Sequence, residues 1–272
     1  MSLATQDFDF LRDLVIAGPG IVLEPDRQHV VEARLAQLAL HEGFDSVSHL
    51  IQGVRKNPPA QLQRKLLDVI TNNETWFFRD TQQFETLRKF VLPELITARQ
   101  ASRKLVVWSA ACSTGQEPYS IAMLVREHFP ELQSWNFQII ATDYSSTALQ
   151  RAQLGKYSRF EVNRGMPAIL LAKYFLRDGL DWQLRPEIRG MIEFRPINLT
   201  QPSANIPRSD IVWLRNVLIY FDRGTRHELL QRIRFALTDD ALMVLGAAEN
   251  ISDLQIGLKP LQINNTCWYR PC

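Results

Sequence analysis

Residues 104–118 read KLVVWSAACSTGQEP and carry the clearest fold signal in the chain. The apolar run from Lys104 to Trp108 is typical of a strand that is buried on both faces. A turn-rich segment follows, and Pro118 predicts the first turn of a helix, where the N–H that proline lacks has no intrahelical partner. This stretch therefore predicts a strand, a turn and a helix in succession.

The same alternation continues toward the C-terminus. The helical pattern GTRHELLQRIRFAL precedes the last of the further strands, which are predicted at residues 137–143, 192–197, 210–214 and 241–245. Strands that alternate with helices form a largely parallel sheet covered on both faces. The sequence therefore predicts an α/β fold.

Residues 173–197 interrupt this rhythm. They hold three short β-like pieces, at 174–175, 182–184 and 192–194. We expect these pieces to form a small antiparallel hairpin or a three-stranded flap, a β-subdomain inserted into the α/β domain.

Residues 1–80 show helical rather than strand-like patterning. Two segments have apolar side chains at helical spacing, HVVEARLAQLALHEG and AQLQRKLLDVI. Gly43 ends the first, and the stretch Asn57-Pro58-Pro59 precedes the second. We therefore expect a small N-terminal helical domain and linker at 1–80, and the α/β domain at 81–272.

Composition and charge exclude several classes of protein. The formal net charge is +2, and no basic stripe with interleaved aromatics marks a nucleic-acid binder. No apolar run approaches the ~20 residues of a membrane span, and the N-terminus lacks a secretory pattern. The three cysteines have neither zinc-ligand nor disulfide spacing, and the five histidines fall on predicted helices. We therefore expect a cytoplasmic protein without a metal site.

Polar residues at the ends of the predicted strands indicate a nucleotide site, because parallel sheets bind ligands there. The first turn holds a single glycine, Gly115, so the G-x-G-x-x-G dinucleotide motif is absent. Asp143 ends the second strand, where an acidic residue accepts both ribose hydroxyls. Its alternative role is to cap the next helix, for which Ser145 and Ser146 compete. Together these features favour an adenosine cofactor without pyrophosphate, and S-adenosylmethionine fits.

Two further strand ends and one upstream segment carry candidate residues. Asn198 and Leu199 can pair with an adenine edge, or they form an ordinary polar turn. Arg215 and Asn216 end an otherwise apolar strand, and a functional role is favoured because burying them uncompensated is costly. Residues 70–80 read ITNNETWFFRD, which suits either a lid over a pocket or a helix linker anchored by its aromatics.

Five segments resemble, in order and spacing, the CheR family of chemotaxis methyltransferases: TNNETWFFRD, VVWSAACSTGQEPYSIAM, IIATDYSSTALQRAQLGKY, EFRPINL and LRNVLIYFD. The resemblance implies a small N-terminal helical domain and a Rossmann-like methyltransferase domain with a three-stranded β-subdomain. It also implies methyl transfer from S-adenosylmethionine to glutamate side chains on the cytoplasmic methylation helices of chemoreceptors. The products are glutamate methyl esters and S-adenosylhomocysteine, and we expect the enzyme to be a monomer.

Carried over position by position, the resemblance implies two groups of site residues. Arg79 and Tyr220 look like the residues nearest the transferred methyl group. Cofactor contacts are implied for Asn73, Thr75, Arg79, Glu117, Asp143, Asn198, Leu199, Arg215 and Asn216. The chain departs from the family pattern at Gln116 and at residues 246–250, which read GAAEN where GHSEN is more usual.

The surfaces that recognise receptors are expected to differ from those of part of the family. Residues 1–80 are net acidic and the segment EARLAQL at 32–38 has one arginine, so docking on acidic receptor helices should be weak. The connection formed by residues 174–182 is short and holds one glycine, which predicts a tight turn. Such a turn leaves little room to clasp a receptor's C-terminal pentapeptide, so we expect a pentapeptide-independent enzyme.

Other functions compete with this hypothesis. The chain could bind S-adenosylmethionine and act through a partner without transferring a methyl group, or it could methylate a receptor outside chemotaxis. It could also be an α/β oxidoreductase, which the missing G-x-G-x-x-G motif argues against.

Overall fold

A computed structural model describes residues 3–56, 59–71 and 74–272. The chain divides into two compact units. The first comprises residues 1–73 and 220–225, and the second comprises residues 74–219 and 226–272. The N-terminal unit therefore includes a short segment from the C-terminal half of the chain.

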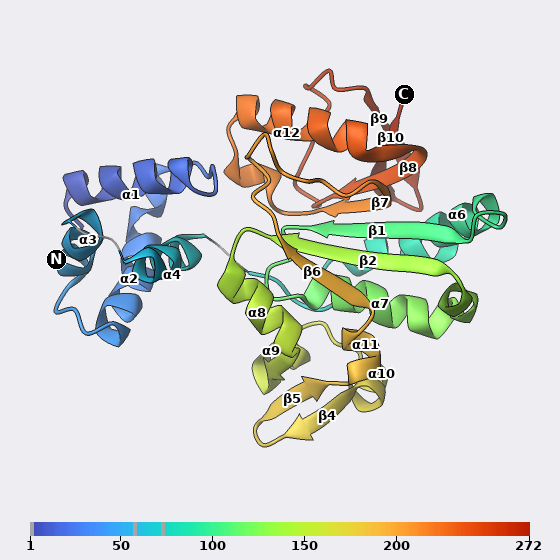
Figure 1. The fold of residues 1–272 in the computed structure, drawn as a ribbon, viewed down its shortest axis with the longest axis horizontal. Helices are drawn as coiled ribbons and strands as arrows, with labels where there is room; N and C mark the ends of the chain where they lie inside the picture. The colour runs from blue at the N-terminus through green and yellow to red at the C-terminus, as the bar shows by residue number, and fades with distance from the viewer. Residues whose placement is uncertain (1–2, 57–58, 72–73) are drawn as a thin grey trace. The chain divides into compact units, whose positions relative to one another are not determined.

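The first unit is helical (Figure 1). Buried apolar residues on one side of each helix form its core. Its elements are α1 (Thr5–Ala17), the 3-10 turn η1 (Pro25–Arg27), α2 (Gln28–His41), α3 (Val47–Lys56) and α4 (Ala60–Ile70). Leu35 of α2 and Leu66 of α4 are completely buried, in agreement with the helical spacing of the sequence. The N–H of Val22 donates to the carbonyl of Tyr220 at 2.8 Å, which attaches residues 220–225 to this unit.

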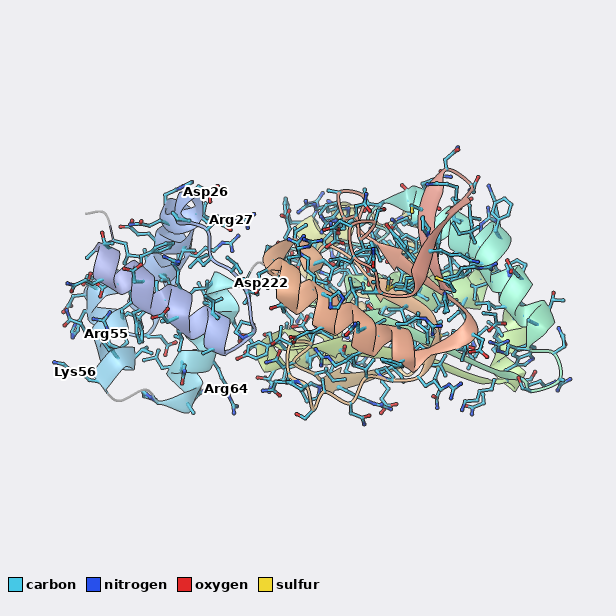
Figure 2. The ribbon with its side chains drawn as sticks, turned by 90° about the horizontal axis from the view of Figure 1, so that it is seen from above. Asp26, Arg27, Arg55, Lys56, Arg64 and Asp222 are labelled. Atoms are coloured by element: carbon cyan, nitrogen blue, oxygen red, sulfur yellow. The ribbon has the colours of Figure 1, made fainter. Side chains whose placement is uncertain are left out.

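Basic side chains of the first unit are spread over several elements (Figure 2). Arg27 lies on η1, Arg55 and Lys56 end α3, and Arg64 lies on α4. Arg55 is also held close to α1, where its guanidinium lies 3.3 Å from the Asp7 carboxylate. These cations therefore come from three elements rather than from one helix face.

The second unit is built on a seven-stranded sheet of order β6-β2-β1-β7-β8-β10-β9 (Figure 1). Its strands are β1 (Lys104–Ala110), β2 (Asn136–Asp143), β6 (Ile192–Pro196), β7 (Ser209–Leu214), β8 (Leu237–Leu245), β9 (Leu258–Ile263) and β10 (Thr266–Pro271). The first five are parallel to one another, and β10 is antiparallel to both β8 and β9. The predicted α/β fold is confirmed.

Helices and short turns complete the second unit. They are α5 (Thr81–Thr86), the π-helical η2 (Leu87–Val91), α6 (Leu92–Ala98), α7 (Gln116–His128), η3 (Pro130–Ser134), α8 (Ser146–Leu154), α9 (Arg159–Asn163), α10 (Ala168–Tyr174), α11 (Pro186–Arg189), η4 (Leu218–Tyr220) and α12 (Arg223–Ala236). The last two extend into residues 220–225. α7 packs on β2 and β6, and its residues 118–125 are all buried. None of the helices in the described ranges has the length and apolar character of a membrane span.

The smaller sheet differs from the expected one. It has the order β3-β5-β4, with β3 (Lys156–Ser158), β4 (Phe175–Asp178) and β5 (Asp181–Leu184) paired antiparallel. The expectation that residues 192–194 supply its third strand was wrong, because Ile192 pairs with Ile139 of β2 in the main sheet. The true third strand has three residues and one buried side chain, so no alternation marks it in the sequence. The small sheet therefore spans residues 156–184 rather than 173–197.

The C-terminal hairpin of β9 and β10 was not predicted. Its strands meet at a two-residue turn, where Asn264 and Asn265 have φ angles of 48° and 62°. Positive φ at both central residues is the geometry of a type I′ turn, which asparagine tolerates. The asparagine pair was therefore a usable signal for this hairpin.

We expect Ser158→Ala to destabilise the chain by about 1 kcal/mol, because it removes the capping box of α9. The Ser158 hydroxyl accepts from the N–H of Glu161 at 3.3 Å, and the Glu161 carboxylate accepts from the N–H of Ser158 at 3.0 Å. Thermal unfolding followed by circular dichroism should show a midpoint lower by about 2–4 °C. Ser134→Ala removes an exposed hydroxyl and serves as the control. Equal midpoints for the two variants would contradict the prediction.

Candidate functional site

The strand ends expected to form a site meet at one edge of the main sheet. Ala110 at the end of β1 pairs with Thr142 of β2 and with Leu214 of β7, and Asp143 pairs with Pro196 of β6. This edge carries Glu117 in the first turn of α7, Asp143 as the last residue of β2, and four loop residues, Asn198, Leu199, Arg215 and Asn216. Strand order reverses between β1 and β7, which is where open α/β sheets bind ligands.

The loop between β1 and α7 is bent by residues with left-handed backbone. Ala111, Ser113 and Gly115 have φ angles of 56°, 53° and 90°. A Cβ on Gly115 would lie 2.8 Å from the Cβ of Ala152, so only glycine fits there. The single glycine of this loop therefore allows close packing of the loop on α8.

Asp143 fastens two loops of this edge and is 7% exposed. Its Oδ2 accepts from the N–H of Ser113 at 2.7 Å, and its Oδ1 accepts from the N–H of Ser145 at 2.8 Å. The side-chain cap of α8 is Ser145, whose hydroxyl accepts from the N–H of Ala148 at 3.0 Å. Of the two roles open from the sequence, helix capping thus belongs to Ser145.

Glu117 and Arg215 form a buried ion pair beside this loop. Arg215 Nη1 lies 3.1 Å from Glu117 Oε2, and the Ser109 hydroxyl donates to Glu117 Oε1 at 2.8 Å. Burial raises the pKa of the Glu117 carboxyl above its usual value. The Arg215 charge, the Ser109 hydrogen bond and the Arg79 charge oppose that shift.

Arg215 also holds the segment that precedes α5. Its side chain is 1% exposed. Nη2 donates to the carbonyl of Arg79 at 2.7 Å and to Asp80 Oδ2 at 2.5 Å. One guanidinium therefore links the end of β7, the start of α7 and residues 79–80.

The segment 74–80 combines buried and half-exposed side chains. Phe77 is completely buried, where its ring packs edge-on against Tyr157 at 5.0 Å between centroids. Thr75 and Arg79 remain half-buried, and the Arg79 guanidinium lies 4.2 Å from the centre of the Trp76 ring. The segment therefore anchors on the core through Phe77 and still presents Arg79 to solvent. Asn73, expected beside it, lies outside the described residues.

Arg164 was not singled out from the sequence. Its guanidinium lies 4.0 Å from the centre of the Trp76 ring, and its Nη2 lies 2.7 Å from Glu74 Oε1. Two arginines, Arg79 and Arg164, thus contact one indole. Their separation by 85 positions leaves no local sequence signal for this cluster.

The remaining residues expected in the site, Asn198, Leu199 and Tyr220, contact residues outside the Arg215 network. Asn198 Oδ1 accepts from the N–H of Thr200 at 3.1 Å and from its hydroxyl at 2.8 Å, as in an ordinary polar turn. Leu199 is buried, and its carbonyl accepts from Arg232. Tyr220 belongs to the first unit, where its ring lies 5.7 Å from the Arg27 guanidinium.

Backbone strain is concentrated at this edge. Of the eight described non-glycine residues with positive φ, five belong to the site segments: Phe78, Asp80, Ala111, Ser113 and Asn216. Each such residue costs about 1–3 kcal/mol and persists only where its surroundings enforce it. This clustering is independent support for a functional site here.

The fold and this edge define a Rossmann-like protein that binds an adenosine cofactor without a pyrophosphate motif. Comparison with known protein families identifies the family to which this fold and site belong. Residues 73–267 match the model described as CheR methyltransferase, SAM binding domain, and residues 6–71 match that of the CheR methyltransferase all-alpha domain. The chain belongs to the CheR methyltransferase family, and its cofactor is S-adenosylmethionine.

Curated relatives span nearly the whole chain. Chemotaxis protein methyltransferase 1 of Pseudomonas aeruginosa is 38% identical over 275 residues, covering 99% of this chain and 99% of the relative. Chemotaxis protein methyltransferase Cher2 of Pseudomonas putida is 38% identical over 259 residues, covering 93% and 94%. The chemotaxis protein methyltransferase of Vibrio anguillarum is 32% identical over 255 residues, covering 92% and 91%.

The residues at the sheet edge fit this cofactor, which has a ribose diol, an adenine and an amino-acid end but no phosphate. Small side chains at 110–115 allow a ligand to approach the backbone. Asp143 can accept from the ribose hydroxyls, and Glu117 can pair with the ammonium group. The Nε of Arg215 is a buried donor with no hydrogen-bond partner among the described residues, which a ligand acceptor can satisfy.

We expect Asp143→Ala to weaken S-adenosylmethionine binding about ten- to a hundredfold, or about 1.5–3 kcal/mol. The variant loses the ribose acceptor and also releases the N–H groups of Ser113 and Ser145. Asp143→Asn keeps one acceptor oxygen, so its affinity for S-adenosylmethionine should lie between those of Asp143→Ala and the wild type. Titration calorimetry measures the effect, with Asp239→Asn at an exposed position as the control. Unchanged affinity would remove Asp143 from the cofactor site.

Proposed function

We propose that this chain methylates glutamate side chains on the cytoplasmic methylation helices of chemoreceptors. It acts as a cytoplasmic monomer and leaves glutamate methyl esters and S-adenosylhomocysteine. The observation that carries the proposal is Arg79, a half-exposed guanidinium held on Trp76 next to the buried Arg215–Glu117 pair. A planar fork of donors at this place suits an acceptor carboxylate.

The chemistry makes few demands on proton transfer. S-adenosylmethionine supplies an electrophilic methyl group on a positively charged sulfur. A glutamate with a pKa of about 4.3 is already ionised at neutral pH, so the acceptor needs no general base. The residues of this chain therefore act by orienting the carboxylate and excluding water.

Arg79 and Tyr220 are the residues proposed to touch the acceptor. Arg79 orients the carboxylate, and the Tyr220 hydroxyl donates a hydrogen bond to it. The proposed cofactor contacts are those implied by the family resemblance: Asn73, Thr75, Arg79, Glu117, Asp143, Asn198, Leu199, Arg215 and Asn216.

Receptor recognition is proposed to be independent of a C-terminal pentapeptide. Asp178 of β4 pairs with Asp181 of β5, so only Gly179 and Leu180 form the connecting turn. Gly179 has a φ of 63°, in keeping with a tight hairpin turn. A turn of this length supports the view that no loop is available there to clasp a peptide.

Labelled cofactor and co-expressed receptor test the function directly. Mass spectrometry should find methyl groups on receptor glutamates, and the label should be released as methanol by mild base, as expected of an ester. Cofactor binding without any transferred label would favour the alternative of a binding module. Methyl esters on a receptor of another signalling array would favour the alternative that the enzyme methylates a receptor outside chemotaxis.

We expect Tyr220→Phe to lower kcat about ten- to a hundredfold while leaving cofactor affinity nearly intact. The hydroxyl acts on the acceptor carboxylate, and a hydrogen bond to a charged group is worth about 1.5–3 kcal/mol. Steady-state methylation and titration calorimetry give the two quantities. Tyr174→Phe removes a hydroxyl that contacts Glu127, away from the site, and is the control. Full activity in Tyr220→Phe would end the proposed role of this hydroxyl.

We also expect no saturable binding of a receptor C-terminal pentapeptide at micromolar concentration. The two-residue turn between β4 and β5 leaves no loop to close over an added strand. Calorimetry with the free peptide is the measurement, and methylation of receptors with and without the pentapeptide is the control. Clear micromolar binding, or a rate that depends on the pentapeptide, would overturn this expectation.

A further inference from the structure

Glu249, in the loop after β8, accepts hydrogen bonds from two backbone segments at once. Oε2 accepts from the N–H groups of Asn216 and Gly246, each at 2.7 Å. Oε1 accepts from those of Val217 at 2.9 Å and Leu218 at 2.8 Å, and from that of Ile219 at 3.4 Å. One carboxylate thus gathers five N–H groups, four of them from the loop after β7.

The loop after β7 needs such an acceptor. Asn216 has a φ of 58°, in the left-handed region that asparagine adopts more readily than other residues with a side chain. The next N–H groups lead into the short turn η4, where the first donors have no partner within the turn. A carboxylate at this position satisfies them and also interacts favourably with their aligned dipoles.

Gly246 shows how closely the two loops approach each other. A Cβ at this residue would lie 2.6 Å from Asn216 Nδ2, 2.8 Å from Glu249 Oε2 and 2.9 Å from the Asn216 backbone nitrogen. Any side chain here would push the carboxylate and Asn216 apart. Gly246 and Glu249, together with Asn250, are the residues that GAAEN shares with the more usual GHSEN of the family.

We propose that Glu249 is a positioning residue for methyl transfer. It acts through the backbone of residues 216–219, which follow Arg215 and lead to Tyr220. It fixes the direction in which this loop leaves β7, and it contacts neither cofactor nor acceptor. The proposal deepens the proposed function and rests on it for the role of Tyr220.

The test compares four variants of the full chain at a temperature at which each is folded. Glu249→Ala removes all five acceptor contacts, and Glu249→Gln keeps one acceptor oxygen. Gly246→Ala keeps the carboxylate but displaces it. Asn250→Ala is the matched control, because the hydrogen bonds of its side chain within the described part of the chain go to Ser252 in the same loop.

We expect kcat to fall about a hundredfold in Glu249→Ala, since a displacement of roughly 1 Å has an effect of that size. Glu249→Gln and Gly246→Ala should lie between this value and wild type, and Asn250→Ala should match wild type. S-adenosylhomocysteine affinity should fall less than kcat, because of the proposed cofactor contacts only Arg215 and Asn216 adjoin this loop, whereas Asp143 ends β2 and Glu117 begins α7. Amide hydrogen exchange at residues 216–219 should accelerate in the same order as kcat falls.

Two results would overturn the proposal. One is Glu249→Ala with a kcat near wild type, and the other is unchanged amide exchange at residues 216–219. A lower melting temperature with unaltered kcat per folded enzyme would mean a structural role only, which also overturns it. Absence of receptor methylation by the wild type would instead sink the proposed function, and amide exchange would still show whether Glu249 restrains residues 216–219.

Discussion

The site depends on the ion pairs and hydrogen bonds of the buried Arg215 guanidinium. Removing such a charge from water costs several kcal/mol, and the cost is recovered only if its donors are well paired. Glu117, Asp80 and the carbonyl of Arg79 supply those partners. They come from the start of α7 and from the segment before α5, so the ion network sets the places of both. Loss of the Arg215 guanidinium would leave the buried Glu117 carboxylate without this cation and would release more than one segment.

The charges around this network agree with the two ligands of the proposed reaction, which have opposite sign. Asp80 and Glu117 are two carboxylates on one buried guanidinium, which leaves excess negative charge at the inner edge. That excess suits a cationic cofactor. Arg79 and Arg164 lie on Trp76 toward solvent, where positive charge suits an anionic acceptor. Reaction between a cation and an anion then needs their orientation more than it needs proton transfer.

Local patterns predicted the five parallel strands of the main sheet well, because continuous apolar runs and their alternation with helices are visible within a few residues. They failed for β3, which is too short to show alternation, and for the hairpin of β9 and β10. They assigned residues 192–194 both to a main strand and to the small sheet, because the apolar pattern fits either, and the structure places them in the main sheet. Strand-end residues could be predicted as a group, since topology brings carboxyl ends together. Their partners could not be predicted. Arg215 meets Glu117 and Asp80 at separations of 98 and 135 residues, and Glu249 meets Asn216 at 33.

Three acidic side chains at this edge share a task that their charge alone does not reveal. Asp143 accepts a hydrogen bond from the N–H of Ser113, and Glu249 accepts one from the N–H of Asn216. Asp80 has a left-handed backbone conformation of its own, and its carboxylate pairs with Arg215. Each carboxylate therefore stabilises a strained backbone that would relax without it. Removing one of these acids releases a loop as well as any ligand contact, so lost binding alone does not identify a ligand-binding residue. An amide that keeps one acceptor oxygen separates the two effects, because it preserves part of the backbone bonding while it abolishes the charge.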